Sequence, residues 1–116
     1  MPIASVQNRY NLIERGDDPV LDYCAQHGIA YLPWGPLAAK PFAPEAPLAH
    51  ASELVAQMTG DPGASAGQIA LAWLLRRSPN IILIPGTTSI AHLEENIAAA
   101  AVRLSEDQFA ALSGLD

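Results

Sequence analysis

The chain divides into short apolar runs and longer amphipathic segments, separated by clusters of Gly, Pro, Asn, Asp and Ser. Short apolar runs without alternation are typical of strands buried on both faces. We predict three such strands, over residues 3–7, 29–32 and 80–85. Helical spacing and terminal signals predict helices over residues 19–27, 48–58, 68–77, from 90 to about 101, and from 106 to about 113.

The helix ends carry recognisable signals. An acidic pair followed by Pro19 favours a helix start, and Gly28 is expected just beyond the C-terminus of that helix. Residues 65–68 and 105–108 have the spacing of capping boxes. The first helix should bury one side, made of Val20, Leu21 and Cys24. The helix over 68–77 is apolar nearly all round and should be covered on both faces. The helix from residue 90 carries one apolar stripe, made of Ile90, Leu93, Ile97 and Ala101.

Strands that alternate with helices predict an α/β fold with parallel strands. Residues 33–47 hold five of the ten prolines and are expected to form a long surface loop. Three βα units are too few to close a barrel, and an open three-stranded sheet leaves two edges unprotected. Because the chain also enters strand-like sequence at once, we expect it to be part of a larger protein or to associate with copies of itself.

Composition and charge narrow the class of protein. Half of the 116 residues are hydrophobic and 16% are charged, which excludes a disordered tail. A net charge of −6 has the wrong sign for a nucleic-acid binder. No apolar run is long enough for a membrane span. The single cysteine, Cys24, has no internal disulfide partner, so a cytoplasmic location is expected.

Three segments should meet at the carboxyl ends of the strands, where parallel α/β proteins bind ligands. Gln7 offers a side-chain amide that could orient a ligand or cap its strand. Trp34 could stack on a flat ring or anchor its loop. The turn at Gly86 combines hydroxyls with a helix N-terminus and suits a phosphate, although Thr88 or Ser89 could simply be the N-cap.

Taken together, these segments and one helix resemble the aldo-keto reductase family. The likeness covers essentially the whole chain, with four motifs in the right order and spacing. They are VQNRYNL at residues 6–12, GIAYLPWGPLA at 28–38, SAGQIALAWLL at 65–75 and IPGTTSIAHLEENI at 84–97.

The resemblance implies a (β/α)8 barrel (TIM barrel) enzyme that reduces aldehydes and ketones to alcohols with NADPH, NAD being possible. Residues 1–116 would be its C-terminal part, strands six to eight, and hence a partial barrel of three of eight βα units. By position, ten residues would contact the cofactor. Gln7 would bind the nicotinamide carboxamide, Trp34 would stack on the nicotinamide ring, and Gly35 and Leu37 would line the pyrophosphate. Gly86, Thr87 and Thr88 would face the ribose and its 2′-phosphate, with His92 nearby, and Glu95 and Asn96 would contact the adenine.

Two departures from the family pattern bear on function. Gly86 and His92 stand where relatives often carry a lysine and an arginine, so the preference for the 2′-phosphorylated cofactor is open. The family's catalytic Asp, Tyr, Lys and His lie in a first half that this chain lacks, and Tyr10, in a loop without a nearby lysine, is no substitute. We therefore expect an oxidoreductase portion that is inactive alone, completed by an N-terminal half-barrel. The alternative is a stand-alone, non-catalytic, self-associating nucleotide-binding protein.

Overall fold

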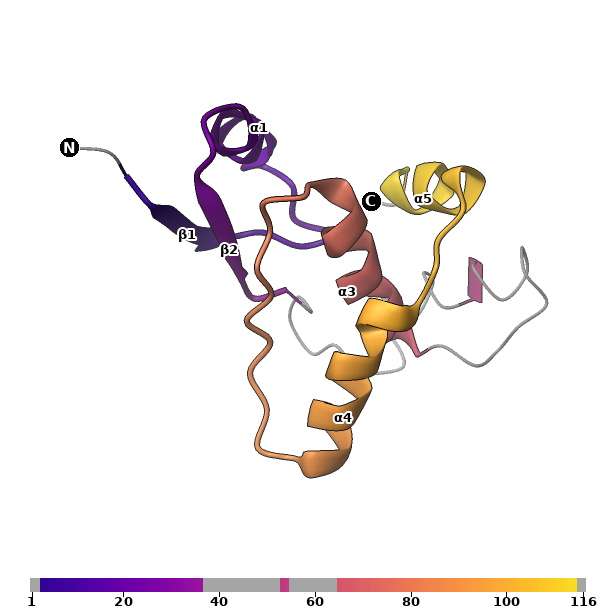
Figure 1. Ribbon diagram of the computed structural model, residues 1–116. Helices are drawn as coiled ribbons and strands as arrows, with labels where there is room; N and C mark the ends of the chain where they lie inside the picture. Colours follow the sequence, from indigo (N-terminus) through magenta and orange to yellow (C-terminus); the bar gives the residue numbers. More distant parts are fainter. Residues whose placement is uncertain (1–2, 37–52, 55–64, 115–116) are drawn as a thin grey trace.

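In the computed structural model, residues 3–36, 53–54 and 65–114 are described. The elements in chain order are β1 (Ser5–Arg9), α1 (Asp18–Gln26), β2 (Ala30–Trp34), α3 (Ala66–Arg77), α4 (Ile90–Ala98), the short 3-10 helix η1 (Ala99–Ala101) and α5 (Glu106–Ser113). Helix α3 lies at the centre, with the strands to its left, α5 to its right and α4 below it (Figure 1).

The first unit is a parallel β1–α1–β2 crossover, as predicted, although β1 begins and ends two residues later than expected. Helix α1 ends where Gly28 adopts a φ of +68°. The Ile29 N–H then donates to the Cys24 carbonyl at 2.9 Å, which returns the chain toward β2 and confirms the predicted glycine position. Leu21 and Cys24 are buried as expected, but Val20 is 38% exposed, which corrects its assignment to the buried side.

The prediction of a full strand over residues 80–85 is wrong. The structure has only a single parallel bridge there, between Tyr31 and Ile81. The Tyr31 N–H donates to the Asn80 carbonyl, and the Ile82 N–H donates to the Tyr31 carbonyl, both at 2.9 Å. The described chain then runs on without regular structure to α4.

Proline explains why this ladder stops after one bridge. In a parallel pair, alternate residues of a strand bond to the same neighbour. Pro33 is therefore the next residue of β2 to face the 80–85 segment, and it has no N–H to donate. The same residue corrects another expectation, because β2 continues through Pro33 and Trp34 where a loop was predicted.

The core forms around α3, whose residues 69–74 are all buried, while Leu75 is 37% exposed. This confirms that most of the helix is covered on both faces. Trp73 stacks on Phe109 of α5, with 5.6 Å between ring centroids, and on Tyr10 at 6.2 Å. Tyr10 thus lies in a loop, as expected, and its side chain is a fully buried part of the core.

Local signals set the helix starts. Both predicted capping boxes are present, at Ser65 with Gln68 and at Ser105 with Gln108. Ser89 is the N-cap of α4. No α4 residue is buried in the described structure, and two members of the predicted apolar stripe, Leu93 and Ile97, line an open hollow between α4 and residues 81–85.

Two expectations fall largely outside the described residues. Of the helix expected over 48–58, only residues 53 and 54 are described, and both are helical. Most of the loop expected over 33–47 also lies outside them. Across the described ranges, no helix has the length and hydrophobicity needed to span a bilayer. The same ranges contain no group of three His, Cys, Asp or Glu side chains arranged to hold a metal ion.

Candidate functional site

Gln7 and Trp34 lie on the same face of the β1–β2 pair. In the parallel register Gln7 faces Leu32 and Arg9 faces Trp34, and alternate residues of a strand share a face. The Gln7 side chain is exposed, and Trp34 is 44% exposed although it belongs to a strand. The two residues therefore present an amide and an indole to the same space at the carboxyl end of the sheet.

The end of β2 is fixed by the segment that follows β1. The Tyr10 N–H donates to the Trp34 carbonyl at 3.2 Å. The Asn11 side-chain amide donates to the Gly35 carbonyl at 2.9 Å, and Asn11 is itself fully buried. Gly35 has a φ of +65°, which only glycine adopts without strain. The backbone beside the indole is therefore held in one conformation.

The sequence analysis assigned no role to Arg9, which lies over the Trp34 ring, or to Glu14, which binds Arg9. The Arg9 guanidinium carbon lies 5.1 Å from the indole centroid, and its Nε donates to Glu14 Oε2 at 2.8 Å. Hydrogen bonds from Asn11 and then from Arg9 lower the pKa of Glu14, so its carboxylate stays ionised. The period-two spacing from Gln7 to Arg9 was the signal that could have placed Arg9 on this face.

The opposite face of the strands is closed by tyrosine–aspartate pairs at the start of α1. Tyr10 donates its hydroxyl to Asp18, and Tyr31 donates its hydroxyl to Asp17. Arg77 of α3 joins Asp18 at 3.2 Å. Burial, reinforced by the neighbouring aspartates, raises the pKa of both tyrosines well above the usual range. Such hydroxyls are poor proton donors, so this cluster is structural.

The turn before α4 is held by its own hydroxyls. Thr87 Oγ1 accepts from the Ser89 N–H at 3.1 Å, and Ser89 Oγ accepts from the His92 N–H at 3.3 Å. This confirms Ser89 as the N-cap. Gly86, Thr87 and Thr88 are exposed. An exposed turn at a helix N-terminus can receive an anion through backbone N–H groups.

The two predicted adenine contacts lie further along α4. Glu95 accepts a hydrogen bond from the Ser65 hydroxyl, and the Gln68 amide donates to the Glu95 carbonyl at 3.0 Å. Glu95 thus ties α4 to the start of α3. Asn96 lines an apolar hollow of about 570 Å³ between α4 and residues 81–85.

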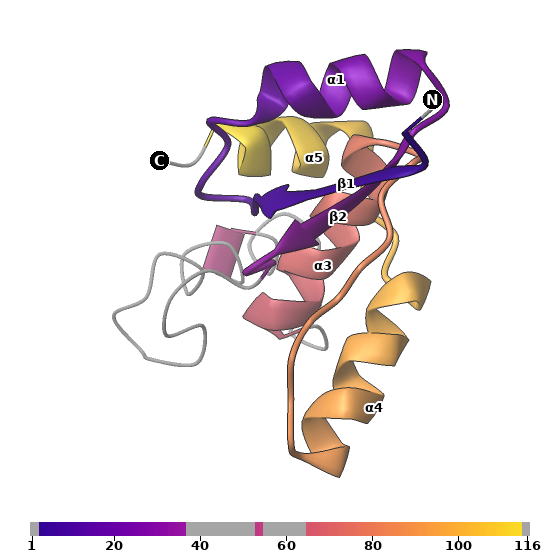
Figure 2. The same cartoon turned by 90° about the vertical axis from the view of Figure 1, so that its left-hand side faces the viewer.

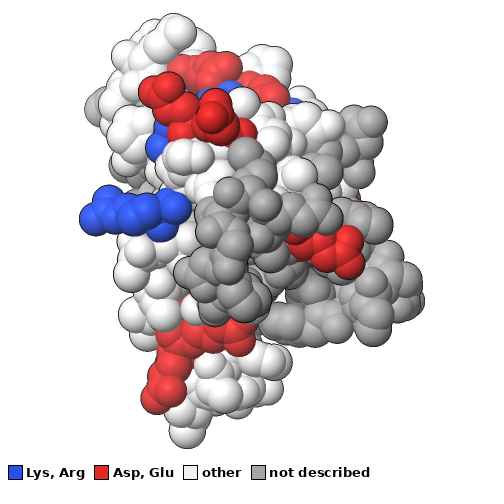
Figure 3. Space-filling model, turned by 90° about the vertical axis from the view of Figure 1, so that its right-hand side faces the viewer, with Lys and Arg blue, Asp and Glu red and all other residues white. Residues whose placement is uncertain are grey.

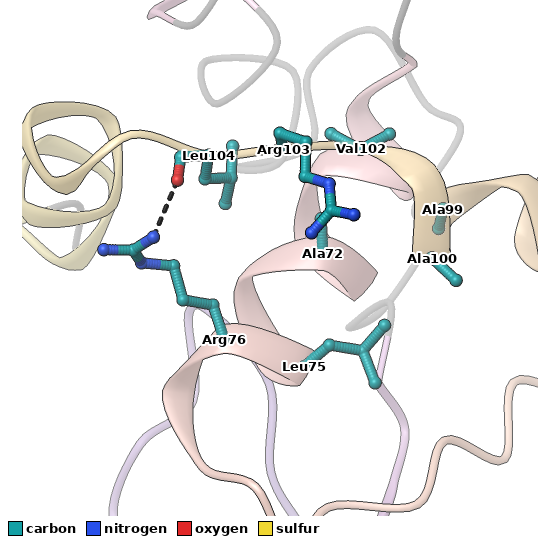
Figure 4. A pocket seen from close by; sticks show the side chains of 8 residues that line it. All are labelled: Ala72, Leu75, Arg76, Ala99, Ala100, Val102, Arg103 and Leu104. Carbon is teal, nitrogen blue, oxygen red and sulfur yellow. Dashed lines mark hydrogen bonds between the residues drawn. The ribbon is translucent and has the colours of Figure 1, made fainter.

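A second hollow, of about 270 Å³, lies between α3 and the chain that joins η1 to α5. Arg76 crosses one side of it and donates to the Leu104 carbonyl at 2.8 Å, while Arg103 points in from above Ala72 (Figure 4). None of the ten predicted cofactor residues lines it.

The structure places the predicted site residues in two groups. Gln7, Trp34 and Gly35 gather at the strands, whereas the turn and α4 carry the rest. The segment that follows the bridge at Ile81 runs beside β2 and extends past its carboxyl end before it reaches the turn at Gly86 (Figures 1 and 2). Acidic side chains gather over α4 at that end of the molecule (Figure 3), where Glu94 and Glu95 belong to the helix. Leu37 lies outside the described residues.

The parallel βα arrangement, with exposed side chains near the carboxyl ends of its strands, is of the kind that builds (β/α)8 barrels. The family model described as "Aldo/keto reductase family" matches residues 1–116. The chain belongs to the aldo/keto reductase family.

Individual relatives agree with this assignment. The chain is 47% identical to pyridoxine 4-dehydrogenase of Escherichia coli K12 over 113 residues, which is 97% of this chain and 37% of that protein. It is 45% identical over 111 residues to an uncharacterised oxidoreductase of Schizosaccharomyces pombe, covering 96% of this chain and 34% of that one. The chain thus spans little more than a third of the length of these curated relatives.

Solved structures show the same architecture. A thermostable aldo-keto reductase in complex with the inhibitor epalrestat matches with a TM-score of 0.82 at 31% identity, covering 99% of this chain and 40% of that one. The aldo/keto reductase of Klebsiella pneumoniae in complex with NADP and acetate matches with a TM-score of 0.77 at 30% identity, covering 94% of this chain and 38% of the other. The parallel α/β fold seen here is consistent with a partial (β/α)8 barrel.

Proposed function

We propose that this chain carries most of the nicotinamide-cofactor site of an aldo/keto reductase, as the C-terminal portion of the barrel. Gln7 would bind the carboxamide, Trp34 would stack on the nicotinamide ring, and Gly86 to Thr88 would receive the adenosine phosphate. The bound nicotinamide supplies the hydride for reduction of an aldehyde or ketone. The carbonyl-binding and proton-donating groups would come from the part of the barrel outside this chain.

The observation that carries the proposal is the exposed indole of Trp34 on the same strand face as Gln7. A ligand that covers this indole removes apolar area from water, which favours binding. A flat ring stacked on it gains dispersion and polarisation energy, and a neighbouring amide with one donor and one acceptor matches a carboxamide.

The turn proposed to receive the adenosine 2′-phosphate lacks the basic side chains that the family often has there. Backbone N–H groups and hydroxyls are available at the turn, but residues 86–96 contain no lysine or arginine, and Glu94 and Glu95 are close in sequence. A charge-assisted bond to the 2′-phosphate would be needed for strong discrimination. We therefore expect NADPH and NADH to bind with affinities that differ by less than about tenfold.

Catalysis by this chain alone is not expected. Proton donation to a carbonyl calls for a tyrosine whose pKa is lowered, and that is often achieved by an adjacent cation. Tyr10 and Tyr31 instead donate to aspartates, and burial raises the pKa of each. The one lysine of the chain, Lys40, lies outside the described residues.

Cofactor titration tests the binding half of the proposal. Saturable binding of NADPH and of NADH should be seen by calorimetry, with quenching of Trp34 fluorescence. Trp34→Leu should weaken both cofactors by about tenfold or more. Tyr23→Phe, on an exposed α1 ring, is a matched aromatic control that should bind normally. A cooperatively folded wild-type chain that binds neither cofactor would overturn the proposal.

Complementation tests the catalytic half. Addition of the N-terminal part of a relative's barrel should give NADPH oxidation with a simple aldehyde, and neither part should turn over alone. The exposed α4 stripe favours a second candidate, a self-associating nucleotide-binding protein. Cofactor binding by an oligomer that gains no activity on complementation would support that candidate instead.

A further inference from the structure

One face of the Trp34 indole is covered by a positive charge. Arg9 and Trp34 are partners in the β1–β2 register, and the Arg9 guanidinium carbon lies 5.1 Å from the indole centroid. This is within the range of a cation–π contact. A ligand that stacks on the other face of the ring would therefore lie close to a fixed cation.

The cation is held in place by three neighbours. Glu14 accepts from Arg9 Nε at 2.8 Å and also from the Asn11 amide at 2.6 Å. Asn11 is anchored in turn to the Gly35 carbonyl at 2.9 Å. Gly35 also lies against the guanidinium, since a Cβ built at this position would be in ordinary contact with Arg9 Nη1 at 3.5 Å. Arg9 thus belongs to the same rigid arrangement that fixes Trp34.

We propose that the Arg9–Glu14 pair sets the relative affinity of this site for oxidised and reduced nicotinamide. The inference rests on the proposed function, in which the nicotinamide stacks on Trp34. The oxidised ring carries one positive charge and the reduced ring carries none. Both forms share the same phosphates, so only the ring responds differently to a cation across the indole.

The size of the effect follows from distance. A ring stacked about 3.5 Å from the indole would lie about 8 to 9 Å from the guanidinium. Coulomb repulsion at that separation weakens the oxidised form by roughly twofold at the dielectric constant of water and by roughly thirtyfold at the effective dielectric constant of a protein surface. Glu14, on the far side of Arg9, offsets part of this repulsion.

Two substitutions that change the charge beside Trp34 in opposite directions test this proposal. Arg9→Met removes the cation and keeps the apolar stem, and Glu14→Gln removes only the negative charge. The measured quantity is the ratio of Kd for NADP⁺ to Kd for NADPH. We expect this ratio to fall roughly twofold to tenfold in Arg9→Met and to rise about twofold in Glu14→Gln. Arg9→Lys, which keeps the charge, is the matched control and should leave the ratio near that of wild type. Equal ratios in all four proteins would overturn the inference while leaving the proposed function intact.

A second measurement does not depend on a complete cofactor site. The cation 1-methylnicotinamide and neutral nicotinamide share one ring and both quench exposed tryptophan. Trp34 is 44% exposed and Trp73 is fully buried, so quenching reports on Trp34. The ratio of the cationic to the neutral quenching constant should rise in Arg9→Met and fall in Glu14→Gln.

The two readouts separate the two claims. A wild-type chain that binds neither cofactor would remove the proposed function. Even then, quenching ratios that change in Arg9→Met and Glu14→Gln would show that the charge of Arg9 acts on a ring that approaches Trp34. Quenching ratios that do not respond to either substitution would overturn the inference whatever the titrations show.

Discussion

Asn11 shows how much a single side chain can hold together near the strand ends. Its Oδ1 accepts from the N–H groups of Ile13 and Glu14 at 3.0 and 2.7 Å, and its Nδ2 donates to the Gly35 carbonyl at 2.9 Å. The residue is fully buried. Asn11→Ala would leave these groups without partners, so we expect a loss of about 2–4 kcal/mol in the free energy of unfolding, measured in urea.

A second Asn→Ala substitution, at a partly exposed position, separates the effect of the buried hydrogen bonds from that of replacing an asparagine by alanine. Asn96→Ala, on the partly exposed side of α4, should change the unfolding free energy by less than about 0.5 kcal/mol. If Asn11→Ala unfolds at the same urea concentration as wild type, the amide does not organise the segment after β1.

The tyrosine–aspartate pairs predict a stability that declines at high pH. Burial and the aspartates Asp17 and Asp18 raise the pKa of Tyr10 and Tyr31 in the folded chain. Below the unfolded pKa of about 10, both states keep the phenolic protons and the contribution is constant. Above it the unfolded chain loses protons that the folded chain retains. Stability should then fall by up to about 1.4 kcal/mol per pH unit for each tyrosine.

Urea unfolding between pH 8 and pH 11 measures this decline. The double variant Tyr10→Phe/Tyr31→Phe should be less stable near neutrality but should show a shallower decline above pH 10 than wild type. Burial also raises the pKa of Cys24, which adds a loss in the same direction from lower pH in both proteins. Tyr23→Phe, on an exposed ring, is the matched control. Parallel curves for the double variant and wild type would refute the linkage.

At the scale of elements, the sequence correctly predicted the features that depend on residues close together in the chain, such as the helix ends. Capping signals at Ser65, Ser105 and Gly28 lie within a few residues of the groups they satisfy, and all three are confirmed. The third strand failed because its pairing depends on Pro33, about fifty residues earlier, which cannot donate to the next rung of the ladder. The role of Arg9 was missed for a similar reason, since it required the register between β1 and β2.

The two capping boxes give a matched comparison between elements. Ser105→Ala should cost about 1 kcal/mol, because it removes one N-cap bond from α5. Ser65→Ala removes the same bond from α3 and also the hydroxyl that Glu95 of α4 accepts. We therefore expect Ser65→Ala to cost about 1 kcal/mol more than Ser105→Ala in urea unfolding.

A double-mutant cycle isolates the tie between α3 and α4. Ser65→Ala combined with Glu95→Ala should show a coupling free energy of about 0.5–1.5 kcal/mol. The pair Ser105→Ala and Glu95→Ala, which share no contact among the described residues, should be additive. Coupling near zero for Ser65 and Glu95 would mean that the cap acts on α3 alone.

At the scale of the whole molecule, the described sheet is short and open. Strand β1 pairs only with β2 in the described residues, and the 80–85 segment meets β2 at one bridge. A closed barrel has no such edges. The chain spans little more than a third of its curated relatives' length, and the proposed cofactor site lies beside surfaces that a complete barrel would cover.

The most exposed of these surfaces is the α4 stripe, which leads to the last prediction. Ile90, Leu93 and Ile97 are 76%, 48% and 68% exposed and lie at helical spacing on one side of α4. Each apolar side chain left in water forgoes about 1.5–3 kcal/mol that burial would contribute. We expect the isolated chain to self-associate with rising concentration, as measured by sedimentation velocity. Ile90→Gln/Ile97→Gln should shift that association to higher concentration.

A control variant distinguishes association through the α4 stripe from nonspecific hydrophobic association. Val20→Gln replaces a partly exposed apolar residue on α1, away from the stripe, and should leave the association unchanged. If the N-terminal part of a barrel covers α4 and the sheet edge, its addition should replace the self-associated species by a one-to-one complex. A wild-type chain that stays monomeric at every concentration while folding cooperatively would mean that the exposed stripe is tolerated in water, and that covering it does not drive assembly of the barrel.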